Sequence, residues 1–296
     1  MNYAAFARLV APARPSAQLW RLVLGVILTG AVTIGLSQSV LAIARVALDE
    51  NAFWLFLAEV ETARTPMGLL ILLTSLGGMG LGAVLAARLL HRRGLVSLIG
   101  PVPLALRQAL RVLGALALLY GAVALLPPWP LWSDTVPGVP PGLWLALLPV
   151  TLLALLIQTG SEELLFRGYL QSQLAARFRH PAIWIGVPSV LFAIGHYAPL
   201  LYGGNAVVVM LWALVFGVIA ADLTARAGTL GPAIALHLVN NFIAIAVTSL
   251  QGEMSGLALR QLPFGAGDEA AVAMILPADL ILLILGWLAA RIALRV

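Results

Sequence analysis

The sequence has 296 residues, of which 61% are hydrophobic and 10% are charged, and its mean hydropathy is +1.02. A soluble domain of this length carries about a quarter charged residues, so the composition excludes an ordinary soluble protein and predicts a chain that crosses a membrane several times. The absence of cysteine excludes disulfides, thiolate metal sites and a cysteine nucleophile. The net charge of +5 comes from arginine, which in membrane proteins mostly sets topology, so no nucleic-acid partner is expected.

Apolar segments of nearly spanning length fall at 20–46, 66–90, 108–126, 150–178, 182–198, 204–225, 229–250 and 270–291. They predict an all-α, polytopic membrane helix bundle with about eight transmembrane helices. The first segment is longer than the apolar region of a secretory signal, so we expect it to be retained as a helix. We expect three parts: N-terminal transmembrane helices 1–3 in residues 1–142, a core of helices 4–7 in 143–250, and a periplasmic loop with the last helix in 251–296.

The distribution of arginine predicts the orientation of the chain. With the N-terminus in the cytoplasm, 14 of the 17 basic residues lie in or toward the cytoplasmic half, and Arg45, Arg64 and Arg260 fall outside. The positive-inside rule therefore predicts that both termini are cytoplasmic and that the proline-rich stretch 127–142 lies outside. We expect a multi-pass protein of a bacterial inner membrane.

A few polar groups interrupt the apolar segments. Each ionisable group at the bilayer centre costs about 2.5–3.5 kcal/mol, so each requires an explanation. The fourth, fifth and seventh segments contribute Glu162, Glu163, Arg167, His196, His237 and Asn241. Glu163 and Arg167 are four residues apart and are expected to form an ion pair, while Glu162 points about 100° away from Glu163 on the helix. Helical rise places the side chains roughly 12–24 Å into the membrane, so the three segments are predicted to meet there.

These residue types suit the hydrolysis of an amide by an activated water. A carboxylate and an imidazole acting on one water can remove its proton. A second imidazole and a side-chain amide can donate hydrogen bonds to a developing oxyanion. The alternative is a divalent metal, such as Zn²⁺ held by Glu162, His196 and His237, which would activate the water directly. The H-E-x-x-H signature is absent, and the sequence leaves both mechanisms open.

The spacing of these residues resembles a known family. Glu162-Glu163-x-x-x-Arg167, Phe192-x-x-x-His196 and His237-x-x-x-Asn241 are similar, in this order, to the three motifs of the CPBP intramembrane proteases. That family includes type II CAAX prenyl proteases and bacterial proteins linked to bacteriocin processing and self-immunity. The resemblance spans roughly residues 145–250.

The resemblance implies an intramembrane endopeptidase acting on a membrane-embedded or lipidated substrate. It implies that Glu162 and His196 activate the water, that His237 and Asn241 stabilise the oxyanion, and that Glu163 and Arg167 support them. It leaves a metallo- or glutamate-type mechanism open. Asn240, three residues from His237, is the alternative to Asn241 in the oxyanion role, although the family spacing favours Asn241.

Two other classes of function compete with the protease. One is a non-catalytic CPBP-fold scaffold, immunity or binding protein, which the loss of a motif residue would favour; no motif residue is missing. The other is a transporter that uses the buried charges as an ion relay, and the sequence lacks the inverted repeats that would favour it.

Five further predictions concern residues outside the motifs. Asp222 is expected to pair with Arg226, four residues away, and Asp279 to face the bundle interior. His91 and His180 are expected to be solvated at cytoplasmic helix ends. The glycines of the second segment, which are expected to allow close helix packing, are Gly77, Gly78, Gly80 and Gly82.

Overall fold

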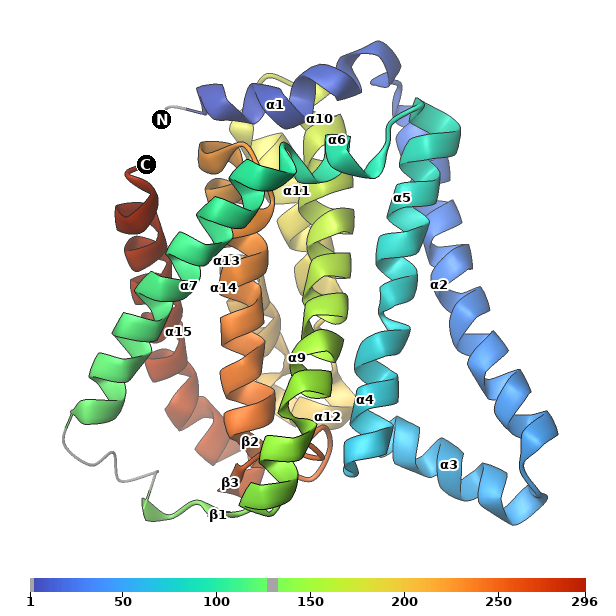
Figure 1. Ribbon diagram of the computed structural model, residues 1–296, viewed down its shortest axis with the longest axis vertical. Coiled ribbons are helices and arrows are strands. Elements are labelled where there is room, and N and C mark those ends of the chain that lie inside the picture. The colour runs from blue at the N-terminus through green and yellow to red at the C-terminus, as the bar shows by residue number, and fades with distance from the viewer. Residues whose placement is uncertain (1–2, 127–132) are drawn as a thin grey trace.

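The computed structural model describes residues 3–126 and 133–296, and these are mostly helical (Figure 1). Within this part of the chain, six helical stretches are long and apolar enough to cross a membrane: Leu19–Ala47, Pro66–His91, Val102–Leu125, Pro141–Arg177, Pro199–Ala227 and Glu269–Leu294. Two shorter apolar stretches, Pro181–Ile194 and Gly231–Val247, correspond to the fifth and seventh predicted segments. The eight predicted segments therefore all occur as helix, and six of them reach spanning length.

The helices in chain order are η1 (Ala4–Phe6), α1 (Ala7–Val10), η2 (Ala11–Ser16), α2 (Leu19–Ala47), α3 (Glu50–Thr62), α4 (Pro66–Ser75), α5 (Gly77–His91), α6 (Leu95–Ile99), α7 (Val102–Leu125), α9 (Pro141–Glu163), η3 (Leu164–Gln171), α10 (Ser172–Arg177), α11 (Pro181–Ile194), α12 (Pro199–Tyr202), η4 (Gly203–Asn205), α13 (Ala206–Ala227), α14 (Gly231–Asn241), η5 (Phe242–Val247) and α15 (Glu269–Leu294). The stretch α9–η3–α10 forms one long span, and α4 and α5 together form another.

The two ends of the bundle differ. One end, here called the terminal end, holds both chain termini, α1, α6 and α10, whereas α3, α12 and the strands lie at the opposite end (Figure 1). The two termini therefore lie on one side of the bundle, in keeping with an even number of crossings. Of the stretch 127–142, residues 127–132 lie outside the described part, and β1 (Val136–Pro137) lies at the opposite end.

Capping residues explain where two helices at the opposite end begin. The Asp49 carboxylate accepts a hydrogen bond of 2.9 Å from the Ala52 N–H at the start of α3. The Thr65 hydroxyl accepts one of 3.1 Å from the Gly68 N–H at the start of α4, where Pro66 occupies the first turn. Each cap satisfies an amide that the helix itself cannot pair.

Glycines bring α5 close to two neighbouring helices, as predicted. A Cβ atom added to Gly78 or Gly82 would lie 2.9 Å or 2.7 Å from the Cα of Thr33 or Thr29 on α2. A Cβ on Gly80 would lie 3.0 Å from the Cα of Ser161 on α9. The backbones of α2, α5 and α9 thus approach one another because one wall of the contact has no side chain.

A small sheet departs from the all-α prediction. The strands β1, β2 (Thr248–Gln251) and β3 (Arg260–Gly265) pair in the order β1-β3-β2, with β1 antiparallel and β2 parallel to β3. In the register, Val136 lies opposite Gln261 and Thr248 opposite Arg260. The sheet pairs the backbone of loops that lie beyond the helices at the opposite end, where no helix supplies hydrogen-bond partners.

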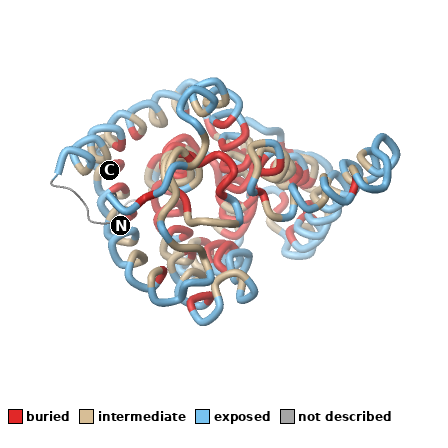
Figure 2. Tube along the Cα trace, turned by 90° about the horizontal axis from the view of Figure 1, so that it is seen from below, coloured by how far each residue is buried: buried red, intermediate tan, exposed pale blue. Residues whose placement is uncertain are grey.

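Burial separates central from peripheral helices. In Figure 2 the buried residues gather in the middle of the bundle, while outlying segments are exposed. In the most apolar 18-residue part of Pro199–Ala227, half of the residues are buried. The corresponding share is 17% for α2 and α15 and 11% for α7. Because the exposed residues of these peripheral helices include Ile27, Leu118 and Ile281, their outer faces are suited to lipid.

Two more of the predictions outside the motifs are confirmed. Arg226 Nε lies 2.8 Å from the Asp222 carboxylate, which also accepts hydrogen bonds from the Tyr3 hydroxyl and the Trp287 indole N–H. His180 is exposed and accepts a hydrogen bond from a backbone N–H at the start of α11.

Two others are wrong. His91 is buried rather than solvated, because the N-terminal segment lies across this end and Ser16 O is 3.0 Å from its Nδ1, while the Tyr169 hydroxyl is 2.8 Å from its Nε2. Asp279 is exposed rather than directed into the interior, because α15 is a peripheral helix with little of its surface covered.

Candidate active site

Three helices carry the six predicted site residues. Glu162 and Glu163 end α9, and Arg167 lies in η3, which continues the same helix. His237 and Asn241 lie on α14, and His196 follows α11. At 1.5 Å per residue, Glu162 lies roughly 22 Å from the Arg177 end of its span, which places it well inside the bundle.

Two segments of π-helix adjoin the site. The helix η3 begins at Leu164, directly after Glu163, and η5 begins at Phe242, directly after Asn241. A π-helix is rare and occurs mostly as a short insertion near functional sites, because the wider turn displaces side chains from the regular α-helical positions. One π-helix begins inside the first motif, between Glu163 and Arg167, and the other begins directly after the last motif, so both adjoin the candidate residues.

Glu163 and Arg167 form the predicted ion pair, and His237 joins it. Arg167 Nη1 donates a 2.7 Å hydrogen bond to Glu163 Oε1, with side-chain exposures of 1% and 0%. His237 Nδ1 lies 2.8 Å from the same oxygen. Because a carboxylate only accepts hydrogen bonds, Nδ1 of His237 carries a proton and Nε2 points away from Glu163.

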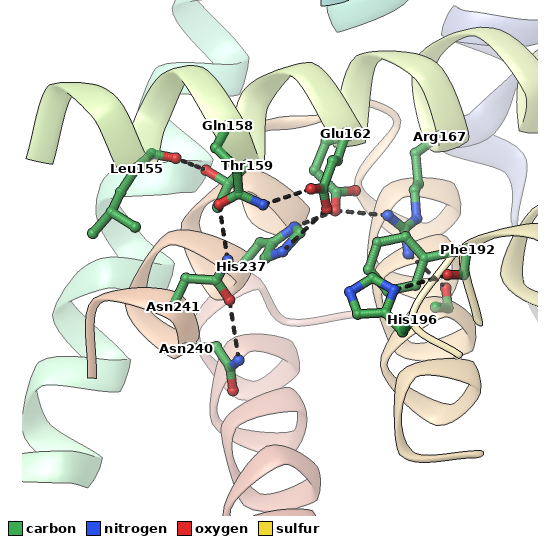
Figure 3. A network of polar contacts seen from close by, with 12 residues as sticks. Leu155, Gln158, Thr159, Glu162, Arg167, Phe192, His196, His237, Asn240 and Asn241 are labelled. Carbon is green, nitrogen blue, oxygen red and sulfur yellow. Dashed lines mark hydrogen bonds and ion pairs between the residues drawn. The ribbon is translucent and has the colours of Figure 1, made fainter. Parts of the chain in front are cut away.

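Glu162 faces the other ring nitrogen of the same histidine. Its Oε2 lies 3.6 Å from His237 Nε2, and this buried oxygen has no hydrogen-bond partner among the described residues. Its Oε1 accepts a 2.6 Å hydrogen bond from the Gln158 side-chain amide. His237 therefore lies between two carboxylates, one paired with an arginine and one held by a neutral amide, and each carboxylate keeps a second oxygen without a hydrogen-bond partner among the described residues (Figure 3).

Amide side chains extend the network from Glu162 to α14. Asn241 Nδ2 donates to Gln158 Oε1 at 2.9 Å, and Asn240 Nδ2 donates to Asn241 Oδ1 at 3.4 Å (Figure 3). Asn241 is thus nearer to the carboxylates than Asn240, which agrees with the preference of the family spacing for Asn241. Sequence reasoning missed Gln158, although an amide four residues before Glu162 in an apolar helix was the signal that could have found it.

His196 lies beside this network rather than within it. Its Nδ1 is 2.8 Å from the Phe192 carbonyl, which can only accept, so Nδ1 carries a proton and neutral His196 has its lone pair on Nε2. The Phe192 ring packs on His196 at 4.4 Å between centroids, and the Arg167 guanidinium lies 4.8 Å from that ring. Unlike the other five residues, His196 is exposed, and its side chain is turned toward its own helix rather than bonded to Glu162.

Glu162, His196 and His237, the ligands of the alternative metal mechanism, do not come together around one point. Within the described residues, no cluster of three or more His, Cys, Asp or Glu side chains is arranged to hold a metal ion. Glu162 and His237 are close, but His196 is turned toward the Phe192 carbonyl. The arrangement of these three side chains therefore does not fit a three-ligand zinc site.

The comparison with protein families agrees with the motifs. The sequence model of the family described as "Type II CAAX prenyl endopeptidase Rce1-like" matches residues 140–243 of this chain. This range contains all six candidate residues. No curated protein and no solved structure matches the chain. The resemblance to the CPBP proteases that the motifs indicated is thereby confirmed for this part of the chain.

Proposed function

Because residues 140–243 are a domain of the Rce1-like type II CAAX prenyl endopeptidase (CPBP) family, which implies a CAAX-type intramembrane protease, we propose that this protein hydrolyses a peptide bond of a membrane-embedded or lipidated protein. The observation that carries the proposal is the free Oε2 of Glu162, held 3.6 Å from His237 within apolar helices. We place the proteolytic core in residues 143–250, in the inner membrane of a bacterium.

The charges of the cluster support a defined division of roles. Glu163 and Arg167 neutralise each other, and their full burial makes the pair a fixed element of the site. The remaining negative charge belongs to Glu162. The oxyanion role proposed for His237 requires a proton on both of its ring nitrogens, and with that charge the group is neutral as a whole. In this state Glu162 is a base and the Nε2–H of His237 is a donor.

The proposed reaction begins with a water bound at Glu162 Oε2. Glu162, assisted by the lone pair on Nε2 of His196, takes a proton from the water while its oxygen bonds to the carbonyl carbon of the substrate. The carbonyl oxygen becomes an oxyanion, which accepts hydrogen bonds from His237 Nε2 and Asn241 Nδ2. One N–H of the Asn241 amide is used by Gln158, and the second is available to the oxyanion.

The second half of the reaction returns the proton. The carbon–nitrogen bond breaks, and the proton held by the Glu162–His196 base passes to the nitrogen of the departing amine. The products are a carboxylic acid and an amine, and Glu162 is again a carboxylate. Gln158 holds Glu162 Oε1 throughout, so that Oε2 remains directed toward the reaction.

The test is proteolysis by the purified full chain in liposomes, using a panel of prenylated, acylated and unmodified membrane peptides. We expect the wild type to cleave at least one peptide, and Glu162→Gln to lose roughly 10²- to 10⁴-fold in kcat because it removes the base but keeps the side-chain shape. If the wild type binds peptides and cleaves none, the protein is a CPBP-fold scaffold or binding protein instead.

A chelator distinguishes the two mechanisms in the same assay. Unchanged cleavage after chelation, with protein shown to be metal-free, is the result expected of a carboxylate–imidazole base. Loss of cleavage that Zn²⁺ restores would overturn that mechanism, while leaving the assignment as a protease intact.

A further inference from the structure

A basic basin lies at the terminal end, far from the candidate active site. It has a volume of about 470 Å³ and is open to the surface. Its lining residues come from the N-terminal segment, the first turn of α2 and the end of α10: Arg14, Ala17, Gln18, Leu19, Trp20 and Arg177. Two guanidinium groups and an indole thus face one space from three parts of the chain.

The two arginines have no acidic partner among the residues that the structure describes. Arg14 and Arg177 are exposed, and neither forms an ion pair within the described residues. The acidic residue of the described chain nearest to this end, Asp222, is already held by Arg226, Tyr3 and Trp287. The positive charge of the basin is therefore available to an anion that the protein does not supply.

The first turn of α2 adds to this positive potential. Gln18 occupies the N-cap position without a side-chain hydrogen bond, and the first turn contains no acidic residue. The amides at the start of a helix have no partner within it, and the helix dipole favours negative charge there. The helix start therefore adds a smaller positive potential to that of the two arginines.

An exposed apolar stripe continues from the basin along α2. Trp20, Val23 and Ile27 are 57%, 57% and 61% exposed and lie on successive turns of this membrane-length helix. The guanidinium of Arg21 lies 5.1 Å from the centre of the Trp20 ring and donates to the Leu90 carbonyl, which fixes the indole at the rim. Tryptophan at this depth is typical of the membrane–water interface.

We propose that this basin binds the headgroup of an anionic phospholipid, with the phosphate between Arg14 and Arg177 and the acyl chains along the apolar stripe of α2. Basic pockets between helices at a membrane boundary bind such headgroups, and the stripe distinguishes a lipid from a free phosphate. A bound lipid would join the N-terminal segment to the end of α10, which belongs to the same continuous helix as Glu162. The proposal does not depend on the proteolytic activity.

The test is lipid binding by the purified full chain in a neutral detergent, followed by native mass spectrometry. The ligands are phosphatidylglycerol, phosphatidylcholine with the same acyl chains, and glycerol 3-phosphate. The pocket variant is Arg14→Gln/Arg177→Gln. The matched control is Arg107→Gln/Arg111→Gln, which removes the same charge from two exposed residues of α7 at the same end. Melting temperatures in phosphatidylcholine identify any variant that fails to fold.

We expect phosphatidylglycerol to bind more tightly than phosphatidylcholine, and the pocket variant to lose this preference. With about fivefold for each basic residue near a membrane surface, the loss is on the order of thirtyfold, against less than twofold in the control. Equal loss in both variants, or equal binding of the two lipids by the wild type, would overturn the proposal. Binding of glycerol 3-phosphate as tight as that of the lipid would also overturn it, because the acyl chains would then have no role. If the pocket variant does not fold, Arg177→Gln alone decides the matter, with about fivefold expected and no change refuting the site.

Discussion

Neutralising one carboxylate of the Glu162–Glu163 pair should affect stability, and neutralising the other should affect chemistry. Glu163→Gln leaves the guanidinium of Arg167 in a position that is 1% exposed, without its 2.7 Å carboxylate partner. Breaking a buried ion pair from one side costs about 3–5 kcal/mol, because an uncompensated charge remains in a medium of low dielectric constant. Whole domains are stable by only about 5–15 kcal/mol, so this loss should lower expression and the melting temperature in detergent.

Glu162 lies in a different environment from Glu163. Glu162 Oε1 accepts a hydrogen bond from Gln158, and in Glu162→Gln the carbonyl oxygen of the new amide accepts the same bond. The Glu163–Arg167 pair also remains whole in this variant. We therefore expect a melting temperature close to that of the wild type. The double variant Glu163→Gln/Arg167→Gln provides a control, because removing both charges should be less destabilising than the sum of the two single changes.

The measurement is thermal unfolding in detergent of Glu162→Gln, Glu163→Gln, Arg167→Gln and the double variant beside the wild type. All are compared at one heating rate, because unfolding of such proteins is often irreversible. A stable Glu163→Gln together with an unfolded Glu162→Gln would show that the two roles are reversed. Additive effects of Glu163→Gln and Arg167→Gln would show that the two groups do not depend on each other, which would refute the reasoning from burial.

Four other outcomes are expected. Asn241→Ala should lower kcat by about 10²–10³ with little change in KM, since its hydrogen bond forms to the developing oxyanion; steady-state kinetics on a cleaved peptide will check this. Gly82→Ala should destabilise by about 1–3 kcal/mol, because its Cβ would lie 2.7 Å from the backbone of α2, while Gly114→Ala, with nothing within 4 Å, should not lower the melting temperature. Reporter fusions at both chain ends should report the cytoplasm, and one between α7 and α9 the far side; the opposite result would refute the positive-inside argument. Burial and the hydrogen bond to Asp222 raise the pKa of Tyr3 to about 12, so the stability it contributes is complete below pH 10 and lost as the pH rises through about 12; the melting temperature of Tyr3→Phe should lack that decline.

The parts of the site that the sequence predicted are those fixed within one helix. Glu163 with Arg167 and Asp222 with Arg226 are four residues apart, and helical geometry places such pairs on one face whatever the rest of the chain does. Hydropathy located the helices for a similar reason, because a span must be apolar over its own length.

What escaped prediction depends on contacts between helices. Which ring nitrogen of His237 faces which carboxylate follows from the rotation of α14 against α9, and no spacing within either segment encodes it. The burial of His91 follows from the N-terminal segment folding back over the terminal end, and the small sheet from loops that meet only after the helices have packed. The π-helices are equally hidden, because the sequence of η3 shows no feature that distinguishes it from a continuation of α9 as α-helix.

Two adjacent glutamates are useful here because neighbouring residues on a helix point about 100° apart. Glu163 is directed to Arg167, which gives it a permanent counter-charge, and Glu162 is directed to Gln158, a neutral donor that holds one oxygen and leaves the other free. His237 contacts both, so the fixed carboxylate orients the ring that faces the free one. The pair therefore separates the requirement for a stable buried charge from the requirement for a reactive one.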